Sequence, residues 1–210
     1  MEVLQKISEE LQKGNFKEVP KLVQEALYTG IAPSKILSDG LVAGMDVVGE
    51  RFRMDEIFLP EVLISAKAMQ AGMEVLRPRL VETGAKLAGK IVLGTVKGDI
   101  HDIGKNLVKM LLEGAGYQVI DAGIDVPIEK FVDAVKINRP NILGLSALLT
   151  TTMPMMKEVI ESLIEAGVRN NVKVMVGGAP ITEKFAKDIG ADGYAPDAAS
   201  AVVKVRELIG

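Results

Sequence analysis

The spacing of apolar residues changes near residue 90, and this change constrains the fold more than any other feature. Before Gly84, apolar residues recur every three or four positions, which is typical of amphipathic helices. After Lys90, short apolar runs of strand length alternate with helical patterns. The predicted strands are 91–95, 118–121, 142–146, 172–176 and 193–195, and the predicted helices are 105–113, 128–137, 153–166, 182–188 and 198–208. Such alternation predicts a parallel sheet with helices on both faces.

The first part of the chain predicts four amphipathic helices joined by short links. They run from Val3 to about Gly14, from Phe16 to Gly30, from Pro33 to Phe52, and from Pro60 to at least Leu76. Helices of this length with short connections predict a small bundle. The expected architecture is therefore α/β. We expect residues 1–86 to form a four-helix bundle. We expect residues 87–210 to form a Rossmann-like, flavodoxin-type domain with a five-stranded parallel sheet flanked by helices.

Composition removes several classes of function. The chain has no cysteine, which excludes disulfides, thiolate nucleophiles, cysteine-based zinc sites and iron–sulfur clusters. A net charge of −3 and an aromatic content of 4% give no reason to expect nucleic acid or an anionic membrane as partner. The N-terminal residues lack the layout of a signal peptide, and no apolar run is long enough to span a bilayer. We expect a cytoplasmic protein.

The stretch from Gly94 to Asn106 links the first predicted strand to the following helix, a place where α/β sheets usually bind ligands. Its glycines, Gly94, Gly98 and Gly104, do not have the spacing of a dinucleotide-binding fingerprint. A phosphate-binding P-loop needs four residues between its glycines and a hydroxyl residue after the lysine. Here five residues separate Gly98 from Gly104, and Asn106 follows the lysine. Neither motif is present.

Two further interpretations concern Asp99 and His101. A phosphoacceptor role for Asp99, as in response regulators, is disfavoured because the segment 146–150 after the third strand contains no carboxylate. His101 is the only histidine. A lone histidine is most often structural or simply exposed, but this one lies on a glycine-flanked loop with Asp99 two positions earlier. One imidazole without cysteines cannot build an ordinary zinc site, so a bound transition metal must bring most of its ligands, as in haem or a corrinoid.

Three short motifs in this order resemble the signature of cobamide (vitamin B12)-binding domains of the base-off/His-on type. They are Asp99-x-His101-x-x-Gly104, Ser146-x-Leu148 and Gly177-Gly178. Between them, 41 residues separate Gly104 from Ser146, and 28 separate Leu148 from Gly177, as in that family. The helical part resembles the cap domain of methionine synthase and of small corrinoid proteins. The resemblance covers nearly the whole chain, with a cap domain at 1–86 and a corrinoid-binding domain at 87–210.

The resemblance implies a role for each matching residue. His101 would coordinate cobalt in place of the cofactor's own base, and Asp99 would hydrogen-bond its ring. Thr152 would be the outer member of this ligand-tuning relay, where methionine synthase has serine, so its role is less closely matched. The implied cofactor-binding residues are Gly98, Asp99, Ile100, His101, Asp102, Ile103, Gly104, Ser146, Leu148, Thr150, Gly177, Gly178, Gly193, Tyr194, Ala195, Pro196, Phe58 and Leu59.

Within that set, the glycines would leave room for the nucleotide tail of the cofactor, which Ser146 and Thr150 would face. In the cap, Phe58 and Leu59, with Met69 or Met73, would shield the methyl group on the upper face. The cap methionines also suit a purely structural role, because methionine fills irregular gaps in a core. The helical part of the sequence does not decide between these interpretations.

The function implied is that of a corrinoid protein carrying a methyl group on cobalt between two enzymes. The expected cofactor is a cobamide, either cobalamin or a variant with another benzimidazole-type lower base. The expected partners are a substrate:corrinoid methyltransferase, a methylcorrinoid:acceptor methyltransferase using tetrahydrofolate or a thiol, and a reductive activase. The chain would be a component rather than a complete enzyme, because it has no substrate-binding barrel. Alternatives are a subunit of an adenosylcobamide-dependent isomerase, a corrinoid-sensing regulatory module, and a non-corrinoid protein in which His101 is incidental.

Overall fold

The structure, a computed structural model, describes residues 2–84 and 87–210. The described chain divides into two compact units. One contains the residues up to Ala88 together with Glu113–Gly116, and the other contains Gly89–Leu112 and Tyr117–Gly210. The predicted boundary between residues 86 and 87 falls partly outside the described residues and stays a prediction. No helix in the described residues combines the length and the apolar character needed to cross a lipid bilayer.

The first unit is helical, as the apolar spacing predicts. Its elements are α1 (Glu2–Gln12), α2 (Val19–Tyr28), α3 (Pro33–Lys35), the π-helical turn η1 (Ile36–Val42), α4 (Ala43–Arg53) and α5 (Leu59–Glu82). In α1, Leu4, Ile7 and Leu11 form one buried stripe. Pro60 in the first turn of α5 suits a helix start, and the Glu61 side chain accepts the Phe58 N–H at 3.2 Å. The predicted helical cap is confirmed.

Two details of this unit differ from the expectation. The third predicted helix contains the π-helical turn η1 between α3 and α4, which adds a wider turn without interrupting the helical course. The fourth helix continues beyond Leu76 to Glu82 and contains Pro78 near its end, although proline lacks the N–H for a helical hydrogen bond. Apolar spacing does not predict either feature, because it reports which side chains are buried and not the turn type.

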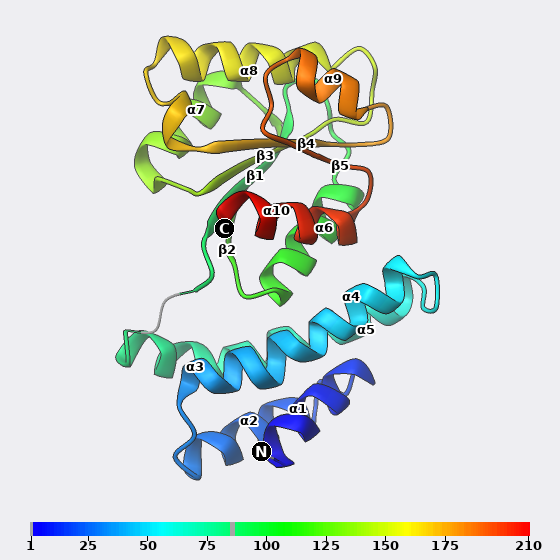
Figure 1. The fold of residues 1–210 in the computed structure, drawn as a ribbon, viewed down its shortest axis with the longest axis vertical. Coiled ribbons are helices and arrows are strands. Elements are labelled where there is room, and N and C mark those ends of the chain that lie inside the picture. The colour runs from blue at the N-terminus through cyan, green and yellow to red at the C-terminus, as the bar shows by residue number, and fades with distance from the viewer. Residues whose placement is uncertain (1, 85–86) are drawn as a thin grey trace. The chain divides into compact units, whose positions relative to one another are not determined.

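The second unit is a five-stranded sheet in the described residues, with parallel pairing throughout and strand order β2-β1-β3-β4-β5 (Figure 1). The strands are β1 (Lys90–Val96), β2 (Gln118–Val126), β3 (Ile142–Ser146), β4 (Lys173–Gly177) and β5 (Gly193–Ala195). This is the order of the flavodoxin-type fold, so the predicted class is confirmed. The strand order reverses between β1 and β3, and ligands of such sheets bind beside this point.

Helices cover both faces of this sheet (Figure 1). They are α6 (Ile103–Gly114), α7 (Ile128–Asn138), α8 (Pro154–Glu165), α9 (Glu183–Asp188) and α10 (Ala198–Ile209), with a short 3₁₀ turn, η2 (Arg169–Asn171). Figure 1 shows α7, α8 and α9 on one face and α6 and α10 on the other. On the first face, Phe131 of α7 packs against Gly94 of β1, where an added Cβ would lie 2.7 Å from the Phe131 ring. Gly94 therefore brings α7 close to the central strand.

Strand β2 is longer than predicted. Its apolar run ends at Asp121, but pairing with β1 continues to Val126 through two register shifts, at Leu93/Gly94 and Gly94/Val96. Gly123 and Asp125 have positive φ angles of 100° and 48°, which accommodate the irregular pairing. The end of β2 consequently reaches the carboxyl edge of β1 and places Asp125 beside the loop that follows β1.

Candidate functional site

Four neighbouring strands end in one row at the carboxyl edge of the sheet. Thr95 of β1 pairs with Ser146 of β3, Ser146 pairs with Gly177 of β4, and Gly177 pairs with Ala195 of β5. The row therefore joins the second and third sequence motifs and the predicted segment 193–196 to the end of β1, and the first motif lies in the loop that follows. These residues lie far apart in the sequence, and the parallel register brings them to one edge, beside the point where the strand order reverses.

The loop after β1 is held in a defined shape before α6 begins at Ile103. Gly98 adopts φ 81°, a left-handed conformation that glycine reaches without steric cost. The N–H of Asp99 donates to the Val96 carbonyl at 3.1 Å. The buried Thr95 hydroxyl donates to the His101 carbonyl at 2.9 Å. These contacts turn the Asp99 side chain towards the loop that follows β3.

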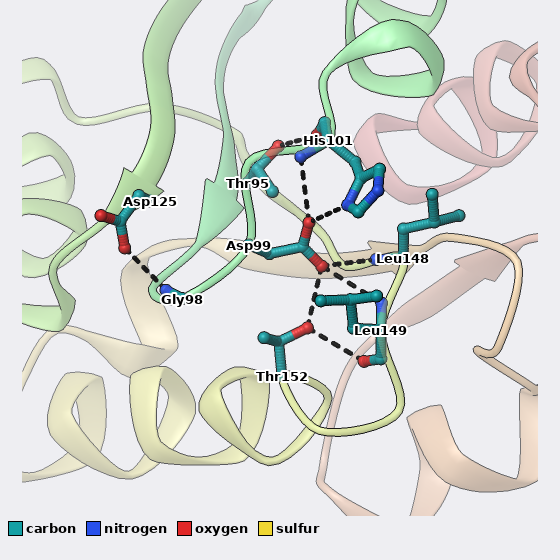
Figure 2. A network of polar contacts seen from close by, with 8 residues as sticks. All are labelled: Thr95, Gly98, Asp99, His101, Asp125, Leu148, Leu149 and Thr152. Carbon is teal, nitrogen blue, oxygen red and sulfur yellow. Dashed lines mark hydrogen bonds and ion pairs between the residues drawn. The ribbon is translucent and has the colours of Figure 1, made fainter.

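Asp99 is fully buried (0% exposed), and both of its carboxylate oxygens accept hydrogen bonds (Figure 2). Oδ1 accepts from the His101 backbone N–H at 3.0 Å and lies 2.8 Å from Nδ1 of the His101 ring. Oδ2 accepts from the backbone N–H groups of Leu148 and Leu149 at 2.7 and 3.2 Å, and from the Thr152 hydroxyl at 2.8 Å. One carboxylate thus connects the loop after β1 to the loop after β3.

These donors keep Asp99 ionised despite its burial. Burial by itself raises the pKa of the Asp99 carboxyl, because it disfavours the charged form. The hydrogen bonds from the backbone of His101 and Leu148, and then from the His101 ring and the Thr152 hydroxyl, outweigh that effect and hold the pKa well below its usual range. An ionised carboxylate only accepts hydrogen bonds, so Nδ1 of a neutral His101 ring carries the proton and Nε2 carries the lone pair.

His101 combines a fixed ring with an accessible second nitrogen. Its side chain is 45% exposed, whereas its partner Asp99 is 0% exposed. Within the described residues, Nε2 has no hydrogen-bond partner, so its lone pair is available to a ligand. The described residues contain no group of three or more His, Asp or Glu side chains arranged to hold a metal ion. A metal bound at Nε2 must therefore bring most of its own ligands.

The predicted glycines have different surroundings. A Cβ on Gly104 would meet nothing within 4 Å, so space is open beside the start of α6. A Cβ on Gly178 would lie 1.8 Å from the Ala147 carbonyl oxygen, and Gly178 has φ 132°. At Gly177 a Cβ would lie 3.3 Å from the Ala195 carbonyl oxygen. Gly178 is thus required by the packing of the chain itself, whereas Gly104 leaves free volume.

Apolar side chains near His101 are exposed. Ile100 and Ile103 flank it in the chain with 69% and 78% exposure, and Leu148, whose side chain lies beside the His101 ring in Figure 2, is 43% exposed. In the helical unit, Phe58 is 66% and Leu59 36% exposed at the start of α5. The exposed apolar side chains around His101 in the α/β unit suit a large and partly apolar ligand better than a small polar one.

The structure does not connect every predicted residue to Asp99. The Asp102 carboxylate instead accepts a hydrogen bond from the Asn106 side-chain amide at 2.9 Å, and this bond fixes the first turn of α6. Ser146, Gly177 and Ala195 lie in the row of strand ends, whereas Thr150 lies in the loop after β3 and Tyr194 lies within β5. Pro196 follows β5 directly. The described hydrogen bonds of Asp99 therefore single out His101 and Thr152 among the predicted side chains.

Three residues of this network are not predicted as site residues from the sequence: Thr95, Leu149 and Asp125. Leu149 acts through its backbone, so its side chain carries no signal. Thr95 could have been suspected, because it is the last polar residue of the predicted first strand. Asp125 accepts a hydrogen bond from the Gly98 N–H at 2.7 Å. The signal for it is a carboxylate close to the carboxyl end of a parallel strand, but the apolar pattern ends that strand at residue 121, five residues before its true end at Val126.

Comparison with known proteins gives consistent matches along the chain. Residues 89–203 and residues 3–77 each match a protein family described as B12 binding domain. The trimethylamine corrinoid protein 1 of Methanosarcina acetivorans is 43% identical over 210 residues, which cover 99% of this chain and 97% of the relative. The dimethylamine corrinoid protein 1 of the same organism is 51% identical over 178 residues, 84% of each chain.

A solved structure is also similar. A chain in the crystal structure of the methanol:cobalamin methyltransferase complex from Methanosarcina barkeri superposes with a TM-score of 0.88 at 36% sequence identity. The match covers 99% of this chain and 80% of that chain. It therefore includes both the helical unit and the α/β unit.

Proposed function

The chain belongs to the B12-binding protein family, and on this premise we propose that it carries a methyl group on a bound cobamide between two methyltransferases. Family membership confirms the resemblance drawn from the three motifs, and the chain is a corrinoid-binding protein. The observation that carries the proposal is the 2.8 Å contact between Asp99 Oδ1 and His101 Nδ1, which leaves Nε2 exposed for cobalt.

The residues at the site fit a corrinoid. A corrin ring supplies four nitrogen ligands, so the protein needs to add a single axial ligand, and His101 is the one histidine of the chain. Ile100, Ile103 and Leu148 offer exposed apolar surface around it. The open volume at Gly104 leaves space beside α6 for the nucleotide tail. We assign the tail to the edge formed by Ser146, Gly177 and the segment 193–196.

A bound cobamide would supply the cobalt chemistry of methyl transfer. His101 would hold this group through Nε2. Asp99 fixes the ring so that Nε2 points outward as the unprotonated nitrogen. Thr152 holds the second carboxylate oxygen, so the orientation of His101 depends on a residue 53 positions from Asp99.

The partners follow partly from the comparisons. The solved complex is that of a methanol:cobalamin methyltransferase, which supports a substrate-specific methyltransferase as one partner of this chain. We further propose a second methyltransferase with a thiol or tetrahydrofolate as acceptor, and a reductive activase. The two relatives named above carry the names of methylated amines, so a methylated amine is the first donor to test. The cobalt, the benzimidazole-type lower base and the contacts of Phe58 and Leu59 are parts of this proposal.

The ligand assignment is tested by adding hydroxocobalamin to the purified apoprotein and recording absorption spectra, and then by reducing the cobalt to paramagnetic Co(II) with a chemical reductant and recording electron paramagnetic resonance spectra. We expect a complex in which a protein nitrogen, and not the benzimidazole, is the lower axial ligand. The His101→Ala variant should lose this signature, and added imidazole should restore it. Unchanged spectra and affinity in His101→Ala would show that His101 is not the ligand.

The carrier function is tested separately. The wild-type protein loaded with cobalamin is mixed with candidate amine methyltransferases, a reductant and methylated amines, and methylation of the cofactor is followed by absorption. Methylation that requires one particular methyltransferase supports the proposal. Absence of methylation with every amine, together with activity as a subunit of an adenosylcobamide-dependent isomerase, would replace it with the isomerase alternative.

A further inference from the structure

Asp125, at the end of β2, makes two hydrogen bonds to the segment that carries the Asp99 side chain, and Figure 2 shows the one between its carboxylate and Gly98. Its Oδ1 accepts from the Gly98 backbone N–H at 2.7 Å. Its own backbone N–H donates to the Asp99 carbonyl at 2.9 Å. These two bonds hold the backbone of Gly98 and Asp99 from both ends, so they restrict the direction in which the Asp99 side chain leaves the backbone.

The conformation of Asp125 suits this contact. Its φ angle is 48°, in the left-handed region that few residues other than glycine, asparagine and aspartate adopt. This conformation follows the register shifts between β1 and β2 and places both its backbone N–H and its side chain next to the loop after β1. The partner Gly98 is also left-handed, with φ 81°, and its N–H points to the Asp125 carboxylate.

The hydrogen bonds of Asp99 to His101 and Thr152 require its side chain to leave the backbone in one direction. Oδ1 must meet the His101 ring at 2.8 Å while Oδ2 meets the Thr152 hydroxyl at the same distance. A small rotation of the Gly98–Asp99 backbone would break one of these contacts, because the two partners come from different loops. Asp125 is the polar side chain that fixes this backbone from the β2 side, as Thr95 fixes the His101 carbonyl from within β1.

We infer that Asp125 is a positioning residue that sets the orientation of the Asp99–His101 pair through the Gly98 N–H, without touching the ring itself. The inference rests on the proposed function for its consequence in cobamide binding, but its structural part applies to the protein without cofactor. It extends the functional unit from the loops after β1 and β3 to the end of β2.

Two substitutions separate the side-chain acceptor from the backbone conformation. Asp125→Asn keeps a side-chain oxygen acceptor, and Asp125→Gly removes it. Asparagine and glycine both tolerate positive φ, so the backbone N–H bond to the Asp99 carbonyl is available in both variants. Circular dichroism and urea denaturation check the fold. Should the glycine variant not fold, Asp125→Ala replaces it, because alanine lacks the same acceptor.

The first readout is the ¹⁵N spectrum of the imidazole ring in the apoprotein, which is free of overlap because His101 is the only histidine. We expect a protonated Nδ1 and an unprotonated Nε2 in the wild type and in Asp125→Asn. In Asp125→Gly the two nitrogen signals should move towards each other, because both tautomers become populated. A glycine variant with wild-type ring signals overturns the inference, as does an asparagine variant altered as strongly as the glycine variant.

The second readout is the dissociation constant for hydroxocobalamin. We expect it to rise about tenfold in Asp125→Gly and to stay within about twofold of the wild type in Asp125→Asn, the size expected for a partner that orients a metal ligand. A wild-type protein that does not bind cobalamin would refute the proposed function, whereas the ring spectra would still decide the role of Asp125. A failure of the proposed function is therefore distinguishable from a failure of the role inferred for Asp125.

Discussion

The hydroxyl oxygen of Thr152 lies 2.8 Å from Oδ2 of Asp99, while the His101 ring contacts the other oxygen, Oδ1 (Figure 2). The same hydroxyl is 2.9 Å from the Leu149 carbonyl, so it has two acceptors for its single proton. The carboxylate consequently joins a buried hydroxyl on one loop to an exposed imidazole on another. Because of this link, we expect substitutions of Thr152 to alter the orientation of the His101 ring.

Substitutions of Thr152 measure how much its hydroxyl group contributes to the free energy of unfolding. Thr152→Val keeps the shape of the side chain but removes the donor to the buried Asp99, and we expect a loss of about 1 to 2 kcal/mol in the free energy of unfolding. Thr152→Ser keeps the hydroxyl and should cost less. Urea denaturation of the apoproteins measures both. Equal stability of the valine variant and the wild type would mean that the hydroxyl contributes nothing to the network.

The Gly104→Ala substitution should have opposite effects on the stability of the apoprotein and on its affinity for cobalamin. A Cβ at this position meets nothing in the protein, so Gly104→Ala should stabilise the apoprotein by up to about 1 kcal/mol, because alanine favours the helix α6. If the open volume receives the nucleotide tail, the same variant should bind cobalamin more weakly. Gly49→Ala in α4, also in open space, is the matched control and should leave binding unchanged. Unaltered cobalamin affinity in Gly104→Ala would place the tail elsewhere.

Alanine substitutions at the two adjacent glycines of the third motif should differ strongly in how much they destabilise the protein. A Cβ at Gly178 would collide with the Ala147 carbonyl oxygen at 1.8 Å, and its φ of 132° disfavours any side chain. We expect Gly178→Ala to cost about 3 kcal/mol or more in the apoprotein, since the collision involves backbone. Gly177→Ala, with its nearest contact at 3.3 Å, should cost less. Thermal unfolding without cobalamin decides this, and similar melting temperatures of the two variants would contradict it.

Lys105 of α6, whose side chain is buried, and Asp121 of β2, whose side chain is partly exposed, form an ion pair between the two elements. The Lys105 ammonium lies 2.7 Å from both Asp121 oxygens, and the lysine side chain is 2% exposed. Asp121→Asn removes the charge that balances this lysine, so we expect a loss of about 3 kcal/mol in the free energy of unfolding at neutral pH. The double variant Lys105→Met/Asp121→Leu should lose less than the sum of its single variants, and strict additivity would mean that the pair is not coupled.

The same pair predicts a pH dependence. Burial raises the pKa of the Asp121 carboxyl, but the Lys105 hydrogen bonds and charge outweigh it, so the pKa in the folded protein lies below the ordinary value. The folded protein therefore binds fewer protons than the unfolded chain, and the stabilisation is present above about pH 4 and lost as the pH falls through the folded pKa. The stability difference between wild type and Asp121→Asn should shrink below about pH 4. A difference that stays constant in urea denaturation down to about pH 3 would contradict this.

Much of the fold is predictable because its signals are local. Each predicted strand of the α/β unit is a short run with apolar residues between turn residues, and each recurs as a strand in the structure. The extension of β2 to Val126 is not predictable in this way. Residues 122–126 contain Gly123 and the exposed Asp125, and they pair with β1 only through register shifts that the neighbouring strand imposes. Such pairing depends on contacts distant in sequence.

The site is predictable where its residues match the motifs of the family that the sequence resembles. Asp99, His101 and Thr152 were expected together, and their hydrogen bonds are present, although their roles towards a cofactor stay predictions. The supporting contacts of Leu149 and Asp125 depend on backbone groups and on a left-handed residue. The Leu149 contact leaves no mark in residue type, and the carboxylate of Asp125 is recognisable only once the true end of β2 is known.

The long sequence separation of Asp99 and Thr152 also has a consequence for protein synthesis. A ribosome adds roughly 5 to 20 residues per second, and Thr152 follows Asp99 by 53 positions, so it is added about 3 to 11 s later. During that interval a nascent chain already contains His101 but lacks the loop after β3. Because Asp99 has neither Thr152 nor the N–H groups of Leu148 and Leu149, the histidine has no fixed orientation. Capture of the cofactor in its final geometry must therefore wait until at least β3 and its loop have been translated.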